Sequence, residues 1–288
     1  EKTDYFNVEM SKGKECSVTQ LHIDRDGNLV IHRVVEKPNA PLREEGKDIG
    51  LDWGLTNLVA TSEGQLLGLS LFPWLKQRDK ELVELTASLQ RQGIKPRSSR
   101  RYRALTRRIS QYVKNEVNRV LNTLAKQDIR SITCEDLDFR GPGLSRRLRV
   151  IVSRAGRGAF KKKLADLTEK QGIVHHEVNP AYTSQECSSC GLVEKKQRKG
   201  SSFTCFHCGR RIHADVNAAR NIIGRRSAST DGFRYQSKET VLDYLNHQFT
   251  ATWGCEPDLI IKRHHARAAG LPGTACSKPG WVSSPIKK

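Results

Sequence analysis

The sequence feature that most constrains this chain is a pair of Cys-x-x-Cys motifs, Cys187/Cys190 and Cys205/Cys208. Each motif can place two thiolates on one tight turn, and four thiolates complete the tetrahedral coordination that zinc prefers. A glycine directly follows each second cysteine, where such a turn favours positive φ. Four unrelated structural cysteines would rarely show this double pattern. A closed four-thiolate site leaves no position for substrate, so we predict one structural Zn²⁺.

The charge of the chain indicates a polyanionic partner. Fifty Lys and Arg residues against 31 Asp and Glu give a net charge of +19. Nucleic acid is the simplest such partner, and a membrane surface is the weaker alternative. No apolar run reaches the roughly 18 residues of a spanning helix, and the N-terminus lacks a signal-peptide core. The remaining cysteines show no pairing pattern, which favours a reducing cytoplasm or nucleoid: Cys16, Cys134, Cys255 and Cys276.

Hydrophobic periodicity predicts the elements around the cysteine module. Residues 17–23 and 28–35 are β-rich and read as a hairpin, followed by a polar linker at 38–46. Residues 73–92 and 100–126 carry apolar side chains at helical spacing and predict an antiparallel helical hairpin. After the module, we expect a helix at 214–223, further helices near 239–249 and 264–269, and a flexible tail from 271.

Two basic segments are candidates for contact with nucleic acid. No acid occurs between Gln90 and Gln111, which favours phosphate contact over a merely solvated helix face. Residues 140–163 hold nine basic residues, four glycines and no acid, which predicts a flexible basic segment that runs into a helix through 171; a disordered, solvated loop is the alternative. The candidate residues are Arg97, Arg100, Arg101, Arg103, Arg107, Arg108, Arg146, Arg147, Arg154, Lys161 and Lys162.

Three carboxylates stand at unusual positions. Asp52 lies inside an apolar strand, where a charge is unfavourable unless it is paired or binds a metal; a solvated turn aspartate is the alternative. Glu135 ends the apolar strand expected at 130–139, and Asp215 lies in the first turn of the helix after the cysteines. His213 is interpreted as a helix-entry residue rather than a site neighbour. We predict that the three acids work together.

The order of elements predicts how the acids would meet. Strands around 48–71, then helices, then strands alternating with helices match a ribonuclease-H-like α/β fold with a long helical insertion and an inserted zinc ribbon. In that fold the first and fourth strands are neighbours, which brings Asp52 to Glu135 and Asp215. Three converging carboxylates need cations, and two Mg²⁺ about 3.5–4 Å apart could activate water for phosphodiester hydrolysis.

These residues also carry a family resemblance. Gly-Leu-Asp52-Trp-Gly-Leu-Thr-Asn-Leu, Ile-Thr-Cys-Glu135-Asp-Leu, the stretch from Asn179 to Gly191, and Asp215-Val-Asn-Ala-Ala-Arg-Asn-Ile resemble TnpB (OrfB), the transposon-encoded relative of type V CRISPR effectors. The resemblance implies that Asp52, Glu135 and Asp215 are RuvC-type catalytic acids and that the cysteines are zinc-ribbon ligands. It also implies a prokaryotic endonuclease that cuts target DNA beside a short flanking motif, guided by RNA from the transposon end.

The resemblance also implies a domain layout. TnpB proteins carry a longer N-terminal half that grips guide RNA, and only the hairpin before Pro38 corresponds to it here. The expected parts are 1–46, a wedge-domain remnant; 47–182 with 211–225, the nuclease domain; 183–210, the zinc ribbon; and 226–288, a partly flexible extension. Two alternatives remain: a DNA-binding protein that is nuclease-deficient or truncated, and a transposase that joins DNA ends. The oligomeric state stays open.

Overall fold

The computed structural model describes residues 19–23, 28–33, 38–54, 56–135, 144–228 and 232–268. The chain divides into two compact units, Glu1–Pro41 and Leu42–Lys288. In the first unit, β1 (Thr19–Ile23) pairs antiparallel with β2 (Leu29–Arg33), which confirms the predicted hairpin. The expected tail from 271, and Cys16 and Cys276, lie outside the described residues.

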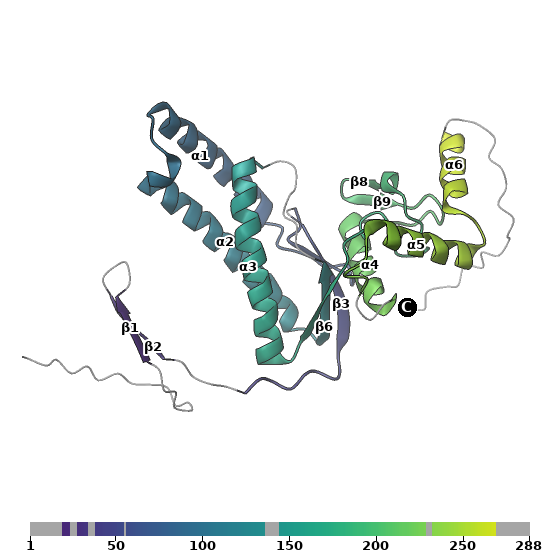
Figure 1. The fold of residues 1–288 in the computed structure, drawn as a ribbon, viewed down its shortest axis with the longest axis horizontal. Coiled ribbons are helices and arrows are strands. Elements are labelled where there is room, and N and C mark those ends of the chain that lie inside the picture. Colours follow the sequence, from purple (N-terminus) through teal and green to yellow (C-terminus); the bar gives the residue numbers. More distant parts are fainter. Residues whose placement is uncertain are drawn as a thin grey trace, which may run out of the picture. The chain divides into compact units, whose positions relative to one another are not determined.

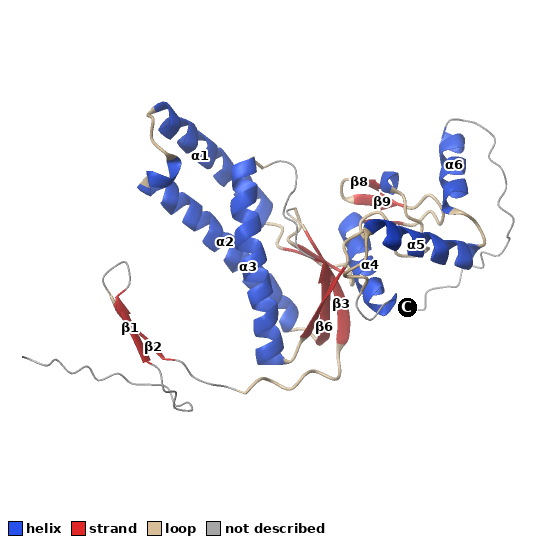
Figure 2. Cartoon of the chain, viewed as in Figure 1, coloured by secondary structure: helices blue, strands red, loops and turns tan. Residues whose placement is uncertain are grey.

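A mixed five-stranded sheet forms the centre of the second unit, so the α/β class is confirmed (Figure 2). Its strands, in the order β5-β4-β3-β6-β7, are β3 (Lys47–Trp53), β4 (Val59–Thr61), β5 (Leu66–Leu67), β6 (Ile129–Glu135) and β7 (Val174–Val178). β3, β4 and β5 pair antiparallel, whereas β3, β6 and β7 run parallel. The predicted pairing of the first and fourth strands of this unit, β3 and β6, is therefore observed.

Three long helices supply most of the apolar core beside the sheet (Figure 1). They are α1 (Leu71–Arg91), α2 (Arg100–Ala125) and α3 (Arg146–Gln171), with a 3₁₀ turn η1 (Pro96–Ser98) between the first two. The apolar stripe predicted on α2, which includes Ile109, Val113 and Leu121, is fully buried. Its N-cap Ser99 accepts a hydrogen bond from the Tyr102 amide, which satisfies one orphan donor of the first turn.

Two boundary predictions need correction. The flexible basic segment expected at 140–163, like its alternative of a solvated loop, is wrong from Arg146 onward, because α3 begins there. Leu148, Val152, Phe160 and Leu164 recur at helical spacing and bury one face. The helix predicted at 214–223 continues past Gly224 as α4 (Ala214–Ala228). Its extension places Arg225 in a buried ion pair described below.

The cysteine module and the C-terminal helices pack together. The module contains η2 (Lys195–Gln197), β8 (Arg198–Lys199), β9 (Ser202–Thr204) and β10 (Arg211–His213), and is followed by α4, α5 (Lys238–Trp253) and α6 (Pro257–Ala268). Trp253 donates its indole N–H to the Cys190 carbonyl at 2.9 Å. Cys255, for which the sequence shows no pairing pattern, is disulfide-bonded. In the described part of the chain, no helix is long and apolar enough to cross a membrane.

Candidate metal centre and acid site

The four predicted zinc ligands converge. The sulfur atoms of Cys187, Cys190, Cys205 and Cys208 all lie within 4.8 Å of one another. The Cys187–Cys208 and Cys190–Cys205 sulfur pairs are 3.7 and 3.5 Å apart. Four sulfurs at 2.3 Å from a tetrahedral Zn²⁺ would be about 3.8 Å apart, so the spacing fits this ion.

Local backbone geometry explains why these ligands gather. Gly191 and Gly209 have φ values of 81° and 69°, as the sequence predicts for the turn after each pair. The amides of His207 and Cys208 each donate to Cys205 Sγ at 3.4 Å. Hydrogen bonds from neighbouring thiols, Cys190 first, lower the pKa of the Cys187 thiol to about 7. The same set of contacts, the bond with Cys187 first, lowers the pKa of the Cys208 thiol and raises the pKa of the Cys190 and Cys205 thiols. Two of the four sulfurs are thus shifted toward thiolate, the form that binds metal.

The position of Asp52 follows from a glycine two residues earlier. A Cβ built on Gly50 would lie 2.0 Å from the carbonyl oxygen of Ala219, so α4 packs directly on β3 at this point. Residues i and i+2 of a strand share a face, which turns Asp52 toward the same side of the sheet. Asp52 is 9% exposed. The alternative of a solvated turn aspartate is therefore wrong.

Strand register places Glu135 beside Asp52. Leu51 pairs with Cys134 across the parallel β3–β6 ladder, and the two acids are the next residues on their strands. Neighbouring residues in register project to the same face of a sheet, so the two carboxylates share one side. Glu135 is half-buried and accepts a hydrogen bond from the Thr183 hydroxyl at 2.9 Å.

Asp215 enters the same region from the first turn of α4. One of its oxygens pairs with Arg198 of β8 at 2.7 Å, and the other accepts from the Asn57 amide at 2.9 Å. Its own backbone amide donates to His213 Nδ1 at 3.3 Å, which agrees with the interpretation of His213 as a helix-entry residue. A negative charge at a helix N-terminus is also favourable.

The acids influence one another electrostatically. Burial raises the pKa of the Asp52 carboxyl well above its ordinary value, and repulsion from Glu135 and Asp215 raises it further, while Arg198 lowers it. A buried carboxylate near two others is the donor set that a hard divalent cation stabilises. Among the described residues, however, the cysteines form the one group of potential ligands drawn together tightly enough to hold an ion. Oxygens of Glu135 and Asp215 are bound instead to protein donors.

Part of the predicted basic surface lines one groove of about 1120 Å³ between α2 and α3. Of the predicted residues, the lining contains Arg97, Arg103, Arg146, Arg147 and Arg154. Lys95 and Lys114 join them, which the sequence reasoning missed, and the lining contains no acid. The other predicted basic residues lie outside this lining and are exposed: Arg100, Arg101, Arg107, Arg108, Lys161 and Lys162.

Three residues that contact the acids were not singled out from the sequence. Asn57 and Thr183 stand inside the motifs that carry the family resemblance, and this was the signal available for them. Arg198 had no such signal, because it belongs to the basic loop between the cysteine pairs and only folding brings it to Asp215.

Comparison with known proteins finds a family model that matches part of the chain. Residues 158–222 match the family model "Cas12f1-like, TNB domain". A TnpB-like protein of Aquifex aeolicus (strain VF5) is 30% identical over 122 residues, which cover 41% of this chain and 40% of that protein. The resemblance to TnpB is confirmed.

Two further matches are a curated bacterial protein and a solved structure. InsQ of Escherichia coli (strain K12) is provisionally named as an RNA-guided DNA endonuclease. It is 27% identical over 210 residues, which cover 64% of this chain and 50% of InsQ. A solved Cas12f1–sgRNA–target DNA complex matches with a TM-score of 0.42 and 19% identity, covering 67% of this chain and 52% of that one. The chain thus spans 50% of the length of InsQ and 40% of the Aquifex aeolicus protein. Their names do not favour the transposase alternative.

Proposed function

We propose that this chain is the nuclease part of an RNA-guided, Mg²⁺-dependent DNA endonuclease of the TnpB type. The observation that supports the proposal is the position of Asp52 beside Glu135 in the β3–β6 register. Burial, and then the charges of Glu135 and Asp215, raise the pKa of the Asp52 carboxyl. The proposed partners are target DNA and a guide RNA from the transposon end. The named relatives support this choice of activity.

The sheet supports a ribonuclease-H-like assignment. Its first three strands are antiparallel, β6 is added parallel to β3, and β7 is added parallel to β6. The sequence-based hypothesis requires this pairing of the first and fourth strands. In the proposed layout, residues 47–182 and 211–225 form the RuvC-type nuclease domain and 183–210 form the zinc ribbon. α1 and α2 are then the long helical insertion, and 226–288 are an extension.

The proposed mechanism divides the work among the acids and Arg198. Asp52, Glu135 and Asp215 would hold two Mg²⁺, which supply an activated water and neutralise developing charge when bound. Asn57 fixes one oxygen of Asp215. Arg198 neutralises Asp215 while the acids lack cations and, being about one-third exposed, can turn toward an anionic phosphate.

The direct test is DNA cleavage by the purified chain with Mg²⁺ and the RNA that co-purifies with it. We expect Asp52→Ala and Glu135→Ala each to reduce the cleavage rate at least about 100-fold, because each change removes several kcal/mol of charge stabilisation. Asp128→Ala is a matched control, since this carboxylate lies on the short loop between α2 and β6, outside the acid site. Cleavage that persists in the Asp52 variant would contradict the assigned mechanism.

The α2–α3 groove is the proposed seat of the nucleic-acid backbone. Its seven basic side chains complement phosphates, and its wall of Val150, Ile151 and Ala155 can accept sugars. We expect Arg146→Glu with Arg154→Glu to weaken binding and to flatten the slope of log K against log salt by about 2. Arg107→Glu with Arg108→Glu changes the same charge outside the groove. Equal losses in both double variants would assign the effect to net charge rather than to the groove.

Binding without cleavage is the second candidate function. It is favoured by the pairing of Asp215 with Arg198 and Asn57, which occupies both of its carboxylate oxygens. On this hypothesis, nucleic-acid affinity is unchanged by Asp215→Ala and no divalent metal supports cutting. Cleavage by the unmodified chain excludes it.

A further inference from the structure

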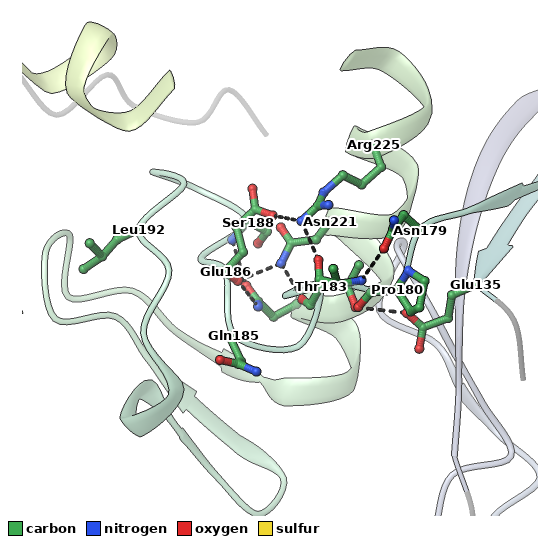
Figure 3. Close-up of polar contacts among 12 residues, drawn as sticks. Glu135, Asn179, Pro180, Thr183, Gln185, Glu186, Ser188, Leu192, Asn221 and Arg225 are labelled. Carbon is green, nitrogen blue, oxygen red and sulfur yellow. Dashed lines mark hydrogen bonds and ion pairs between the residues drawn. The ribbon is translucent and has the colours of Figure 1, made fainter. Parts of the chain in front are cut away.

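A buried threonine links the cysteine module to the acid site (Figure 3). Thr183 is 2% exposed, and its hydroxyl lies 2.9 Å from Glu135 Oε2 and 3.0 Å from the Pro180 carbonyl oxygen. When Glu135 is ionised, the charge-assisted bond to the carboxylate is the stronger of the two. One oxygen of Glu135 is thereby held in place by a residue four positions before the first zinc ligand.

The backbone around Thr183 is held by a row of polar side chains on α4. Asn217, Asn221 and Arg225 are spaced four residues apart, so they lie on one face of the helix, and all three are almost completely buried. Asn221 donates to the carbonyls of Thr183 and Glu186 at 2.8 and 2.7 Å. Asn217 also donates to the Glu186 carbonyl, at 2.7 Å.

Arg225 completes this α4 polar row. Its guanidinium donates to the Ala181 carbonyl at 3.0 Å and to Glu186 Oε2 at 2.8 Å (Figure 3). Between these anchors, Tyr182 adopts a φ of 64°, a strained value for a residue with a side chain. The segment 181–186 is therefore fixed on both sides of Thr183 by the helix that carries Asp215.

We propose that Thr183 is a positioning residue for the acid site: it fixes one oxygen of Glu135, and through the α4 polar row it ties that oxygen to the helix of Asp215. The inference rests on the proposed function. Valine has nearly the shape of threonine, so the hydroxyl can be removed with little change in packing volume. Its effect should appear in cation affinity rather than in folding, because residues that orient metal ligands typically change metal affinity 10–100-fold.

The experiment compares the full chain with Thr183→Val, Thr183→Ser and Thr133→Val. Thr133 is a matched control, because it is fully buried on β6 two residues before Glu135 and its hydroxyl has no hydrogen-bond partner in the described structure. Mn²⁺ titrated calorimetrically, with Asp52→Ala to identify binding at the acids, measures affinity without any cleavage. Zinc content and thermal melting are recorded for every variant.

We expect Thr183→Val to weaken Mn²⁺ binding at the acids about 10-fold or more. The Mg²⁺ concentration for half-maximal cleavage should rise in parallel. Thr183→Ser, which keeps the hydroxyl, should restore both values, and Thr133→Val should change neither. Equal Mn²⁺ affinity in Thr183→Val and the unmodified chain would overturn the positioning role, as would a loss of zinc or of the folded state. If the unmodified chain shows no Mn²⁺ binding that depends on Asp52, the proposed function fails instead.

Discussion

The cysteine quartet and the three acids gather by different routes. Each pair of cysteines comes from one short turn, and the four sulfurs already lie within 4.8 Å of one another. The acids come from β3, β6 and α4, and long-range strand pairing and helix packing bring them together. Asp215 and Glu135 are bound to protein donors, and Asp52 is buried with a raised pKa.

This difference separates a closed site from an open one. Ligands fixed by local turns can close around an ion and keep substrate out, which suits a structural metal. Carboxylates that hydrogen-bond to Arg198, Asn57 and Thr183 can exchange these partners for cations and phosphate. The acid site therefore combines a buried carboxyl of raised pKa with protein partners that can be exchanged, and this is the distinction that the following predictions examine.

The largest effect is expected at the cysteine quartet. Cys205→Ser should abolish stoichiometric zinc binding, and with it the stability of the module, since structural zinc contributes on the order of 10–16 kcal/mol in comparable sites. Cys134→Ala is the control, because Cys134 is equally buried but lies on β6 away from the quartet. Metal analysis of the purified Cys205 and Cys134 variants measures the zinc content of each. Full zinc occupancy in the Cys205 variant would show that the quartet is not the zinc site.

A smaller effect on stability is expected from two ion pairs, one buried in the α4 polar row and one at the acid site. Arg225 pairs with Glu186 at 2.8 Å and its side chain is 3% exposed, whereas the side chain of Arg198 is 32% exposed. Arg225→Ala leaves a buried carboxylate unpaired and should lower the free energy of unfolding by about 3–5 kcal/mol. Arg198→Ala should lower it by only about 0–1 kcal/mol.

Denaturant titration of both arginine variants gives the comparison. Because Arg198 is assigned to the open site, its loss should reduce cleavage far more than stability, and Arg225 should behave in the opposite way. Equal destabilisation by the two changes would mean that Arg198 is a structural residue like Arg225, and the distinction between the sites would lose its basis.

The sequence predicted the parts of the fold that depend on local chemistry. The Cys-x-x-Cys-Gly turns, the apolar stripe of α2 and the N-terminal hairpin are each encoded within a few neighbouring residues, and all are observed. The start of α3 was missed because its basic residues and Gly156 are typical of a loop. The helix depends on tertiary packing, in which Leu148, Val152 and Phe160 are buried in the core.

The acid site was predictable only in part, because its contacts depend on tertiary packing. Each acid stood out because a charge at an element end or inside an apolar strand needs a partner. The partners themselves were not visible, because the contacts of Arg198, Asn57 and Thr183 are tertiary. The split of the basic residues between the α2–α3 groove and the exposed surface also depends on helix packing, since no local pattern distinguishes Arg103 from Arg107.

The smallest predicted effect tests whether the open site stores unfavourable charge. The pKa of Asp52 is raised in the folded state, so its contribution favours folding at low pH and is lost as the pH rises through the folded-state value. Without divalent cations, Asp52→Asn should therefore raise Tm at neutral to alkaline pH, by about 2–4 °C for each kcal/mol of repulsion removed. Below the ordinary aspartate pKa, near 3.8, the two proteins should melt alike apart from the amide substitution itself.

Cations should reverse this ranking. Mg²⁺ favours the ionised acids, so it should stabilise the unmodified chain more than the Asp52→Asn variant. Melting curves with and without Mg²⁺, at several pH values, measure both effects in one series, and Asp128→Asn serves as the control. An Asp52→Asn variant that melts lower than the unmodified chain at alkaline pH without cations would show that the Asp52 charge is already compensated by protein groups such as Arg198. In that case protein groups would satisfy the acid site before any cation binds.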